Sequence, residues 1–351
     1  MESLSAILCG KESIKMENRP IQEPGPGEVQ LSMRNVGLCG SDVYIFKNGS
    51  HGTHRIGGSG ILGHEASAVV TKVGEGVSSL KVGDRVALEP GEACNKCKNC
   101  LRDVRNMCLT EKPFDGNTSK YDGYITRCKL MRADYCYKLP DNVTDEEGAL
   151  MEPLAVAVQD CRRAGVEAGK SVLVLGAGTI GLLCMMTAKA MGATNVCITD
   201  VVEERLKLAK QLGATHTLLT ASPDMDSTVR EIHTLMGGMP DITIECTGNN
   251  FCQRLAIMST IPGGCVAIVG YGAEEVTLPL AVMCQRQIDL RPSWRYDKHC
   301  YPIAIDLVAS GKINVNPFVT HRFSIEQTND AIHVAASRKP GVLKCMVKCN
   351  E

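Results

Sequence analysis

The sequence has no surplus of charge of either sign, no internal repeat and no low-complexity segment. Its 351 residues carry a formal net charge of −1 at pH 7. Proteins that bind nucleic acid or an anionic membrane through their general charge carry a basic excess. The composition therefore argues against both partners, and we expect a small molecule as the ligand.

The sequence also lacks a secretion signal and an unbroken apolar segment long enough to cross a membrane. Its first residues, MESLSAILCG, have no basic start, and their apolar run is short. Two uncharged runs, 171–188 and 255–273, approach the length of a membrane helix, but glycines interrupt both, and Pro262 interrupts the second. We expect these runs to form strands and turns in a cytoplasmic protein.

Most of the 18 cysteines are isolated in the sequence. Disulfides persist mainly in oxidising compartments, and without an export signal we expect free, buried thiols. One cluster stands apart and reads C-x2-C-x2-C-x7-C, formed by Cys94, Cys97, Cys100 and Cys108.

This four-cysteine cluster has the spacing of a metal site. Four thiolates separated by polar loop residues can bind one tetrahedral ion. An iron–sulfur cluster and four unrelated thiols are the alternatives, and the spacing favours zinc. Because four cysteines leave no coordination position for water or substrate, we expect this zinc to brace a loop.

The pattern of short elements predicts an α/β protein with two domains. Hydrophobic residues make up 44% of the chain, which is enough for a large core. Residues 1–155 read as short strands between glycine and proline turns. Residues 156–290 alternate strands with helices, which is typical of a doubly wound parallel sheet. Residues 291–351 lose this alternation, and we expect them to return to the first domain.

A glycine motif follows the first strand of the alternating region. In VLVLGAGTIG, Gly176, Gly178 and Gly181 form G-x-G-x-x-G at the start of a helix, a pattern typical of dinucleotide sites. Asp200 ends the next strand, where a carboxylate accepts hydrogen bonds from ribose hydroxyls and repels a 2′-phosphate. Arg205 could attract such a phosphate, but its helix also carries two glutamates. We therefore predict NAD rather than NADP.

Candidate ligands for a second metal are scattered through the first domain. CGSD carries Cys39 and Ser41, GHEA carries His64 and Glu65, and the apolar MEPLAV carries Glu152. Thiolate, imidazole and carboxylate all bind first-row metals. Each residue also has a plain structural interpretation, as a core thiol, a hydrogen-bonded interior histidine or an acid capping a helix. The residues alone leave both interpretations open.

The segment GHEASAVVTKVGEGV resembles the signature of the zinc-containing alcohol dehydrogenases, and the four-cysteine loop resembles their structural zinc lobe. Over essentially the whole chain, segments occur in the order found in sorbitol (polyol) dehydrogenases: CGSD, GHEAS, YKLPDNV, EEGAL, EPLAV, GAGTIG, IECTG, RY and VTHRF. The resemblance implies a GroES-like catalytic domain over 1–155 and 291–351, a Rossmann domain over 156–290, and a homotetramer.

The resemblance also implies roles for individual residues. The catalytic zinc would be held by Cys39, His64 and Glu65, with Glu152 beside the metal or bound to it and Ser41 in the proton path. The matching positions for NAD are Gly176, Gly178, Ile180, Gly181, Asp200, Arg205, Val269, Gly270, Tyr271, Ser293, Trp294 and Arg295. The matching positions for the polyol are Glu152, Arg295, Tyr296, Phe114 and Thr118.

Several positions depart from the polyol dehydrogenase pattern. Tyr44 and Ile45 stand where the family usually has histidine and tyrosine, and Ala68 replaces a glycine of the signature. Ile45 cannot donate a hydrogen bond to a substrate. The expected reaction is oxidation of a sorbitol-like or xylitol-like polyol to the ketose, with hydride transfer to NAD. A threonine or simple alcohol dehydrogenase, or a non-catalytic NAD-binding homologue, is the alternative.

Overall fold

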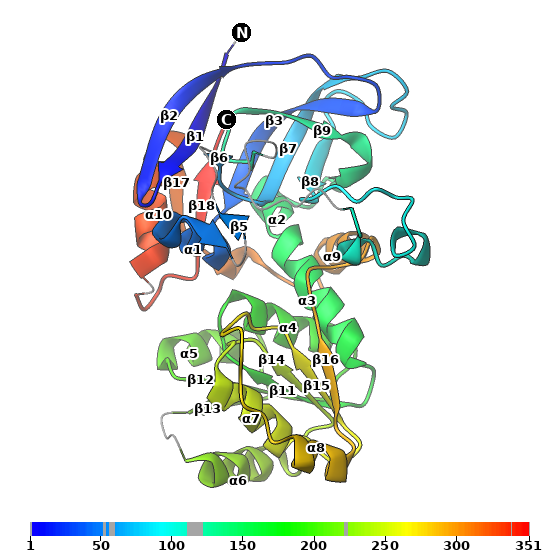
Figure 1. Ribbon diagram of the computed structural model, residues 1–351, viewed down its shortest axis with the longest axis vertical. Helices are drawn as coiled ribbons and strands as arrows, with labels where there is room; N and C mark the ends of the chain where they lie inside the picture. The colour runs from blue at the N-terminus through cyan, green and yellow to red at the C-terminus, as the bar shows by residue number, and fades with distance from the viewer. Residues whose placement is uncertain are drawn as a thin grey trace. The chain divides into compact units, whose positions relative to one another are not determined.

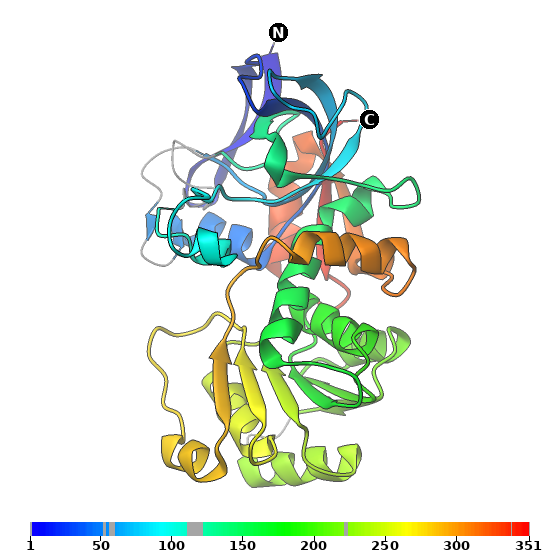
Figure 2. The same cartoon turned by 90° about the vertical axis from the view of Figure 1, so that its right-hand side faces the viewer.

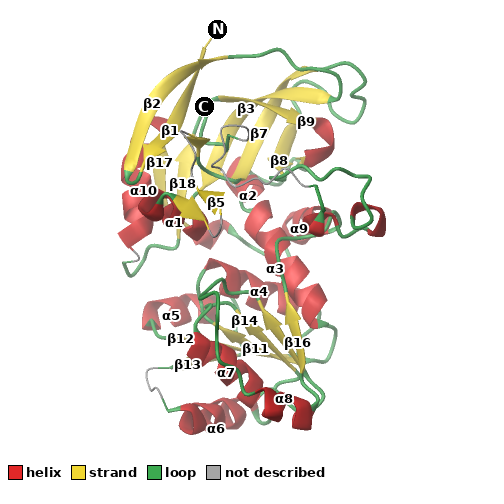
Figure 3. Ribbon diagram, in the orientation of Figure 1, coloured by secondary structure: helices red, strands yellow, loops and turns green. Residues whose placement is uncertain are grey.

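The structure is a computed structural model that describes residues 2–51, 54–55, 60–110, 122–220, 224–337 and 339–350. The chain forms two compact units, the first from 1–152 with 297–351, and the second from 153–296. Figure 1 traces the chain through both, and Figure 3 shows that strands dominate the first unit, whereas helices surround the sheet of the second. The predicted fold class, a β-rich domain beside an α/β domain, is confirmed.

The first unit is built on two main sheets. The larger has the order β10-β8-β7-β3-β18-β17, with β9 also paired to β3, and consists of β3 (Glu28–Gly37), β7 (Glu65–Val73), β8 (Arg85–Leu88), β9 (Cys128–Arg132), β10 (Cys136–Lys138), β17 (Val319–Ser324) and β18 (Lys344–Lys348). The smaller has the order β2-β1-β6 and consists of β1 (Glu2–Gly10), β2 (Ser13–Pro20) and β6 (Gly60–Ile61). β4 (Ser50–His51) and β5 (His54–Arg55) pair with each other.

Helices of the first unit pack around these sheets. They are α1 (Gly40–Asn48), α2 (Asp145–Ala149), α9 (Cys300–Ala309) and α10 (Thr328–Ser337), with short 3-10 turns η1 (Cys100–Arg102), η2 (Arg105–Met107), η3 (Ala133–Tyr135), η4 (Asn316–Phe318) and η5 (Ile325–Gln327). α3 (Met151–Ala164) runs from this unit into the second. The core between sheet and helices contains fully buried Leu31, Phe46 and Ile125.

The second unit is a six-stranded parallel sheet. Its order is β13-β12-β11-β14-β15-β16, from β11 (Ser171–Leu175), β12 (Asn195–Asp200), β13 (His216–Leu219), β14 (Ile242–Glu245), β15 (Cys265–Ile268) and β16 (Asp289–Pro292). The connecting helices are α4 (Thr179–Ala190), α5 (Glu203–Gln211), α6 (Met225–Met236), α7 (Asn250–Ser259) and α8 (Leu280–Arg286). The order reverses direction beside β11, so right-handed crossovers place helices on both faces, as Figure 2 shows.

The two uncharged runs, 171–188 and 255–273, form strands, turns and parts of helices in this second unit. Within the described ranges, no helix combines the length and the apolar character that a membrane span requires. All 18 cysteines are free thiols.

Candidate metal centre and nucleotide site

Strand register in the first unit brings three candidate ligands together. Gly37, at the end of β3, pairs with Glu65, at the start of β7. The chain then turns into α1 with Cys39 as its N-cap, while His64 immediately precedes β7. Ligand atoms of Cys39, His64 and Glu65 all lie within 4.8 Å of one another. A Cβ atom at Gly37 would come within 2.4 Å of a Glu65 carboxylate oxygen, so this close approach requires glycine.

Asp42 fixes the geometry of this cluster from the first turn of α1. One carboxylate oxygen accepts a hydrogen bond from the Cys39 N–H at 2.9 Å. The other accepts one from the Gly63 N–H at 3.1 Å and lies 3.4 Å from Nδ1 of His64. A carboxylate on one ring nitrogen orients a histidine and leaves the opposite nitrogen for a metal.

The electrostatics of His64 favour a cation at this place. Burial alone would lower the pKa of His64, but the carboxylate of Asp42 and the thiol of Cys39 outweigh it and raise that pKa well above its usual value. The same anionic surroundings that retain a proton would attract a metal ion in its place.

Lys344 is the other residue that supports the cluster. Its Nζ donates to both carboxylate oxygens of Glu65, at 2.7 and 2.6 Å, and to the Leu38 carbonyl at 3.1 Å. β18 pairs with β3 at Gly37, which brings the start of β18 to the end of β3 where Glu65 lies. Both side chains of the pair are almost completely buried. Glu65, Cys39 and Glu152 raise the pKa of Lys344 against the lowering effect of burial.

Thiolate, imidazole and carboxylate donors fit a zinc ion, and three protein ligands leave a position for substrate or water. Glu152 lies outside this cluster: it is buried in the first turn of α3, close enough for its charge to act on Lys344. Ser41 is half-buried in the first turn of α1. The residues Cys39, His64 and Glu65 therefore fit an open zinc site.

The four cysteines form a compact cluster in the same unit. The Sγ atoms of Cys94 and Cys100 are 3.9 Å apart, those of Cys97 and Cys100 3.5 Å, and those of Cys97 and Cys108 3.9 Å. Zn–S bonds of about 2.3 Å in a tetrahedron require sulfur atoms about 3.8 Å apart. All four ligand atoms lie within 4.8 Å of one another, so the cluster fits a closed zinc site.

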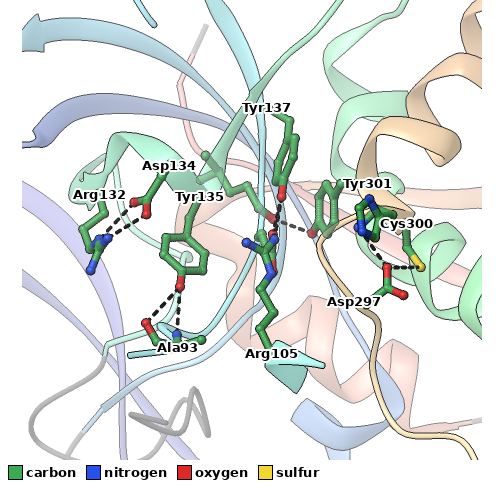
Figure 4. A network of polar contacts seen from close by, with 12 residues as sticks. Ala93, Arg105, Arg132, Asp134, Tyr135, Tyr137, Asp297, Cys300 and Tyr301 are labelled. Atoms are coloured by element: carbon green, nitrogen blue, oxygen red, sulfur yellow. Dashed lines mark hydrogen bonds and ion pairs between the residues drawn. The ribbon is translucent and has the colours of Figure 1, made fainter. Parts of the chain in front are cut away.

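Side-chain contacts tie the loop that carries this cluster to the β-sheet (Figure 4). Arg105, on η2, forms a buried ion pair with Glu89 and donates to the Tyr137 hydroxyl at 2.6 Å. Tyr137 donates to Glu89 at 2.7 Å and stacks on Tyr301 of α9, with ring centroids 4.8 Å apart. The hydroxyl of Tyr301 donates to the Leu88 carbonyl at 2.6 Å. The loop is therefore docked onto β8, β10 and α9.

In the second unit, the glycine motif adopts the predicted strand–turn–helix form. Gly176 has φ +98°, in the left-handed region, and a Cβ at Gly181 would lie 1.7 Å from the Gly176 carbonyl oxygen. Asp200 accepts hydrogen bonds from the Ala177 N–H at 2.7 Å and the Val202 N–H at 2.9 Å. Arg205 lies 3.6 Å from the same carboxylate. Asp200 thus fastens the glycine turn to the end of β12.

The other predicted cofactor positions lie beyond the carboxyl ends of β15 and β16. The N–H groups of Val269 and Gly270 both donate to the Glu245 carbonyl at 2.9 Å. Ser293 donates its N–H to Ile268 at 2.9 Å, and the exposed rings of Tyr271 and Trp294 lie 6.2 Å apart. In parallel sheets, ligands bind at this edge beside the reversal in strand order. Ile180 is half-buried on α4.

Arg295 and Tyr296 directly follow Trp294 in the sequence. Arg295 has φ +49°, and its guanidinium lies 5.9 Å from the centre of the Trp294 ring, whereas Tyr296 is buried. Tyr44 is exposed on α1, and Ile45 is packed in the core. Phe114 and Thr118 lie outside the described residues.

Sequence reasoning placed Asp42 only among the candidate metal ligands of its segment, and it gave no role to Lys344. Asp42 carries a signal, because an acid three residues after a helix N-cap commonly bonds the cap N–H. Lys344 carries none, since only strand pairing brings it to Glu65.

Comparisons with known proteins agree with this geometry. Residues 25–141 match the family described as alcohol dehydrogenase GroES-like domain, and residues 179–310 match the family described as zinc-binding dehydrogenase. The sorbitol dehydrogenase of Mus musculus is 44% identical over 353 residues, covering 99% of this chain and 96% of the mouse protein.

Two solved structures of Escherichia coli proteins are similar over nearly the whole chain. The first is an oxidoreductase/dehydrogenase of unknown specificity, with a TM-score of 0.94, 31% identity and 100% of both chains covered. The second is an alcohol dehydrogenase in complex with NADH, with a TM-score of 0.90, 25% identity and 99% of both chains covered.

Proposed function

The chain belongs to the zinc-binding alcohol dehydrogenase family, and we propose that it oxidises a secondary hydroxyl of a sorbitol-like or xylitol-like polyol to a ketone, with NAD as the hydride acceptor. The balanced reaction converts alcohol and NAD⁺ to ketone, NADH and a proton. The observation that carries the proposal is the cluster of Cys39, His64 and Glu65, in a chain 44% identical to a sorbitol dehydrogenase.

The catalytic roles proposed for residues of the first unit are supported by the contacts of Asp42 and Lys344. When bound, zinc supplies a Lewis acid and NAD a hydride acceptor. Cys39, His64 and Glu65 would hold the zinc ion. Asp42 orients His64 through Nδ1, and Lys344 orients the Glu65 carboxylate. A carboxylate oxygen of Glu152 accepts the hydroxyl proton of the substrate, and Ser41 passes it on toward solvent.

The polyol would be selected by hydroxyl-binding residues. Arg295, Tyr296 and Glu152 offer a guanidinium, a phenol and a carboxylate, which together suit several hydroxyl groups. Phe114 and Thr118 complete the proposed set. Ile45 is packed in the core and presents no donor, so the substrate hydroxyl that a tyrosine would bind there must find another partner.

The cofactor preference is proposed from Asp200. Its carboxylate ends β12, beside the glycine motif, and would repel a 2′-phosphate. Arg205 is already within ion-pair distance of that carboxylate, so its charge is partly balanced. We therefore expect NAD to be used at much higher kcat/KM than NADP.

A homotetramer in the cytoplasm is also part of this proposal. Free thiols at all 18 cysteines suit a reducing compartment. The exposed apolar side chains Leu101 and Leu109, on the loop that carries the four cysteines, suit contact between subunits. Light scattering after size exclusion would measure the number of subunits.

The first experiment is NADH formation at mildly alkaline pH with D-sorbitol, xylitol, L-threonine and ethanol, each with and without a zinc chelator. We expect chelator-sensitive turnover of the polyols alone. Turnover restricted to threonine or ethanol would move the substrate to another branch of the family. Absence of turnover with all four, in protein that contains two zinc ions per chain, would favour a non-catalytic homologue.

A further inference from the structure

A cavity of about 730 Å³ lies in the first unit, and no lining residue belongs to either candidate metal cluster. Its walls come from the start of β3, from β9 and from loops that include Gly76–Ser79 and Gly91–Glu92. Cavities of a few hundred to about 1,000 Å³ are typical of small-molecule sites. None of the proposed catalytic or cofactor-binding residues lines it.

Lys129, on β9, is a half-buried lysine in the wall of this cavity. Its Nζ donates to the main-chain carbonyl of Asp122 and lies 5.8 Å from the centre of the Tyr124 ring. The Asp122 carboxylate is engaged elsewhere, by Arg19 at 2.6 Å and by the Ile61 N–H at 3.2 Å. Among the described residues, no carboxylate forms an ion pair with Lys129.

Burial leaves the ammonium form of Lys129 poorly stabilised. Burial lowers the pKa of Lys129 to about 8, with Asp122 and Glu92 opposing this effect and Arg19 adding to it. A large share of this amine is therefore neutral at pH 8, whereas an ordinary lysine is almost entirely protonated there. Only the neutral amine is a nucleophile.

We propose that Lys129 is a covalent capture site at which short open-chain sugars bind in this cavity as imines. The Nζ lone pair attacks the carbonyl carbon, a C–N bond forms, and the carbonyl electrons move to oxygen, which takes up a proton. The carbinolamine then loses its oxygen as water, the nitrogen gives up its remaining proton, and the C=N bond forms. No oxidant or reductant is consumed, and water reverses the reaction.

The cavity walls favour a hydroxylated carbonyl compound over an apolar one. Hydroxyl, carboxylate and guanidinium groups line it, from Ser78, Ser79, Glu92, Arg132 and Asp134. Such groups hydrogen-bond sugar hydroxyls. The almost fully buried ring of Tyr124 lies beneath the amine, with its centre 5.8 Å from Nζ, and supports that part of the wall.

The test uses the zinc-containing protein with D-glyceraldehyde and sodium cyanoborohydride, which reduces an imine to a stable secondary amine. Peptide mass spectrometry then gives the adduct occupancy of each lysine. At pH 8 and limiting aldehyde, we expect Lys129 to carry several-fold more adduct than Lys72, an exposed lysine on β7. Across pH 6–10, Lys129 labelling should be half-maximal near pH 8.

Two matched variants make the result decisive. Lys129→Arg keeps the positive charge and should remove the fast-labelling fraction, while Lys72→Arg should leave it intact; neither should alter polyol turnover. Labelling of Lys129 at or below the level of Lys72, or the same pH profile for both, would overturn the proposal. Because the labelling does not depend on NAD or on turnover, it can succeed or fail independently of the proposed dehydrogenase activity.

Discussion

The two candidate metal clusters of the first unit are assembled in opposite ways. The four cysteines lie within the span 94–108, so short loop segments alone bring their sulfur atoms together. The second cluster joins Cys39 to His64 and Glu65, and Glu65 is held by Lys344, which is 279 residues away in the sequence. One site depends on local spacing, and the other depends on the pairing of β3, β7 and β18.

The two clusters also differ in charge and in their open positions. Four thiolates complete a tetrahedron and leave no place for substrate. Three mixed ligands leave a position open, and the buried groups Asp42 and Lys344 orient two of them. We propose that this difference separates a bracing site from a reacting one, and substitutions in and around the clusters would test it.

The largest expected effect is on turnover. Cys39→Ala should lower kcat by about a thousandfold or more, because a bound metal contributes several kcal/mol of transition-state stabilisation. Cys97→Ala should keep much of the turnover of the remaining folded protein but lower the melting temperature. Zinc analysis should find one ion per chain in each variant. Equal losses of stability and of activity in both variants would contradict the division of roles.

Lys344→Met should destabilise the zinc-free protein by about 3–5 kcal/mol, because it leaves Glu65 buried without a counter-charge. Zinc should reduce this loss, since the ion then balances the carboxylate. Chemical denaturation with and without zinc measures both values. Lys348→Met, at the exposed end of the same strand, is the matched control. A loss independent of zinc would show that Lys344 does not share Glu65 with the metal.

Arg105→Met should cost about 3 kcal/mol of unfolding free energy, because the buried carboxylate of Glu89 loses its ion-pair partner (Figure 4). Asp103 lies on the same loop and forms an exposed ion pair with Lys298. Asp103→Asn removes this ion pair and should leave the stability unchanged within error. Thermal unfolding of both variants measures the difference. Similar values would show that the loop is not docked through Arg105.

The smallest expected effect is a change in stability at Asp160, a buried acid that lies beside two thiols but is not part of either candidate metal cluster. Asp160, on α3 in the second unit, lies 3.6 Å from the Cys184 sulfur, and Cys161 donates to the Cys184 carbonyl at 3.5 Å. Asp160, Cys161 and Cys184 belong to neither of the two groups of described residues whose ligand atoms lie close enough together to bind one metal ion. Burial raises the pKa of Asp160 to about 7, and its contacts with Ser293 and Cys184 only partly oppose this.

The raised pKa of Asp160 gives a signed pH dependence. Protonated Asp160 makes its full contribution to the free energy of unfolding below the unfolded pKa of about 4. That contribution is lost as pH rises through the folded pKa of about 7, and the total loss is about 4 kcal/mol. Asp160→Asn should recover about half of this at pH 8, since the amide must itself be desolvated. Its advantage over the unaltered protein should grow from pH 5 to pH 8, and its zinc content should not change. A pH-independent difference would rule out this titration.

Much of the fold was predictable because its signals are local. The strands predicted in the alternating region are present as β11, β12, β13, β14 and β15, since short apolar runs bounded by turn residues favour strands. The glycine motif also adopted its predicted turn. The four-cysteine cluster was predictable for the same reason: two-residue spacings keep thiols within reach of one ion whatever surrounds them.

The cluster of Cys39, His64 and Glu65 was only partly predictable. Cys39, His64 and Glu65 could be nominated from their residue types and from a family resemblance, but spacing alone favoured a core thiol and an interior histidine over a shared site. Asp42 lies in the same CGSD segment as Cys39, and its contact with His64 depends on the tertiary structure. Lys344 could not be found, because a lysine at the start of a strand is ordinarily exposed, and nothing near it in the sequence marks it as buried.

The sequence by itself determined the order of strands and helices, the glycine turn and the four-cysteine loop, since each depends on residues covalently close to one another. The tertiary structure decided that Glu65 lies between Cys39 and Lys344, and that Lys129 is half-buried in the wall of a cavity. The reason is physical: strand register is set by the burial pattern of whole sheets, so it joins residues whose own neighbourhoods carry no sign of the contact.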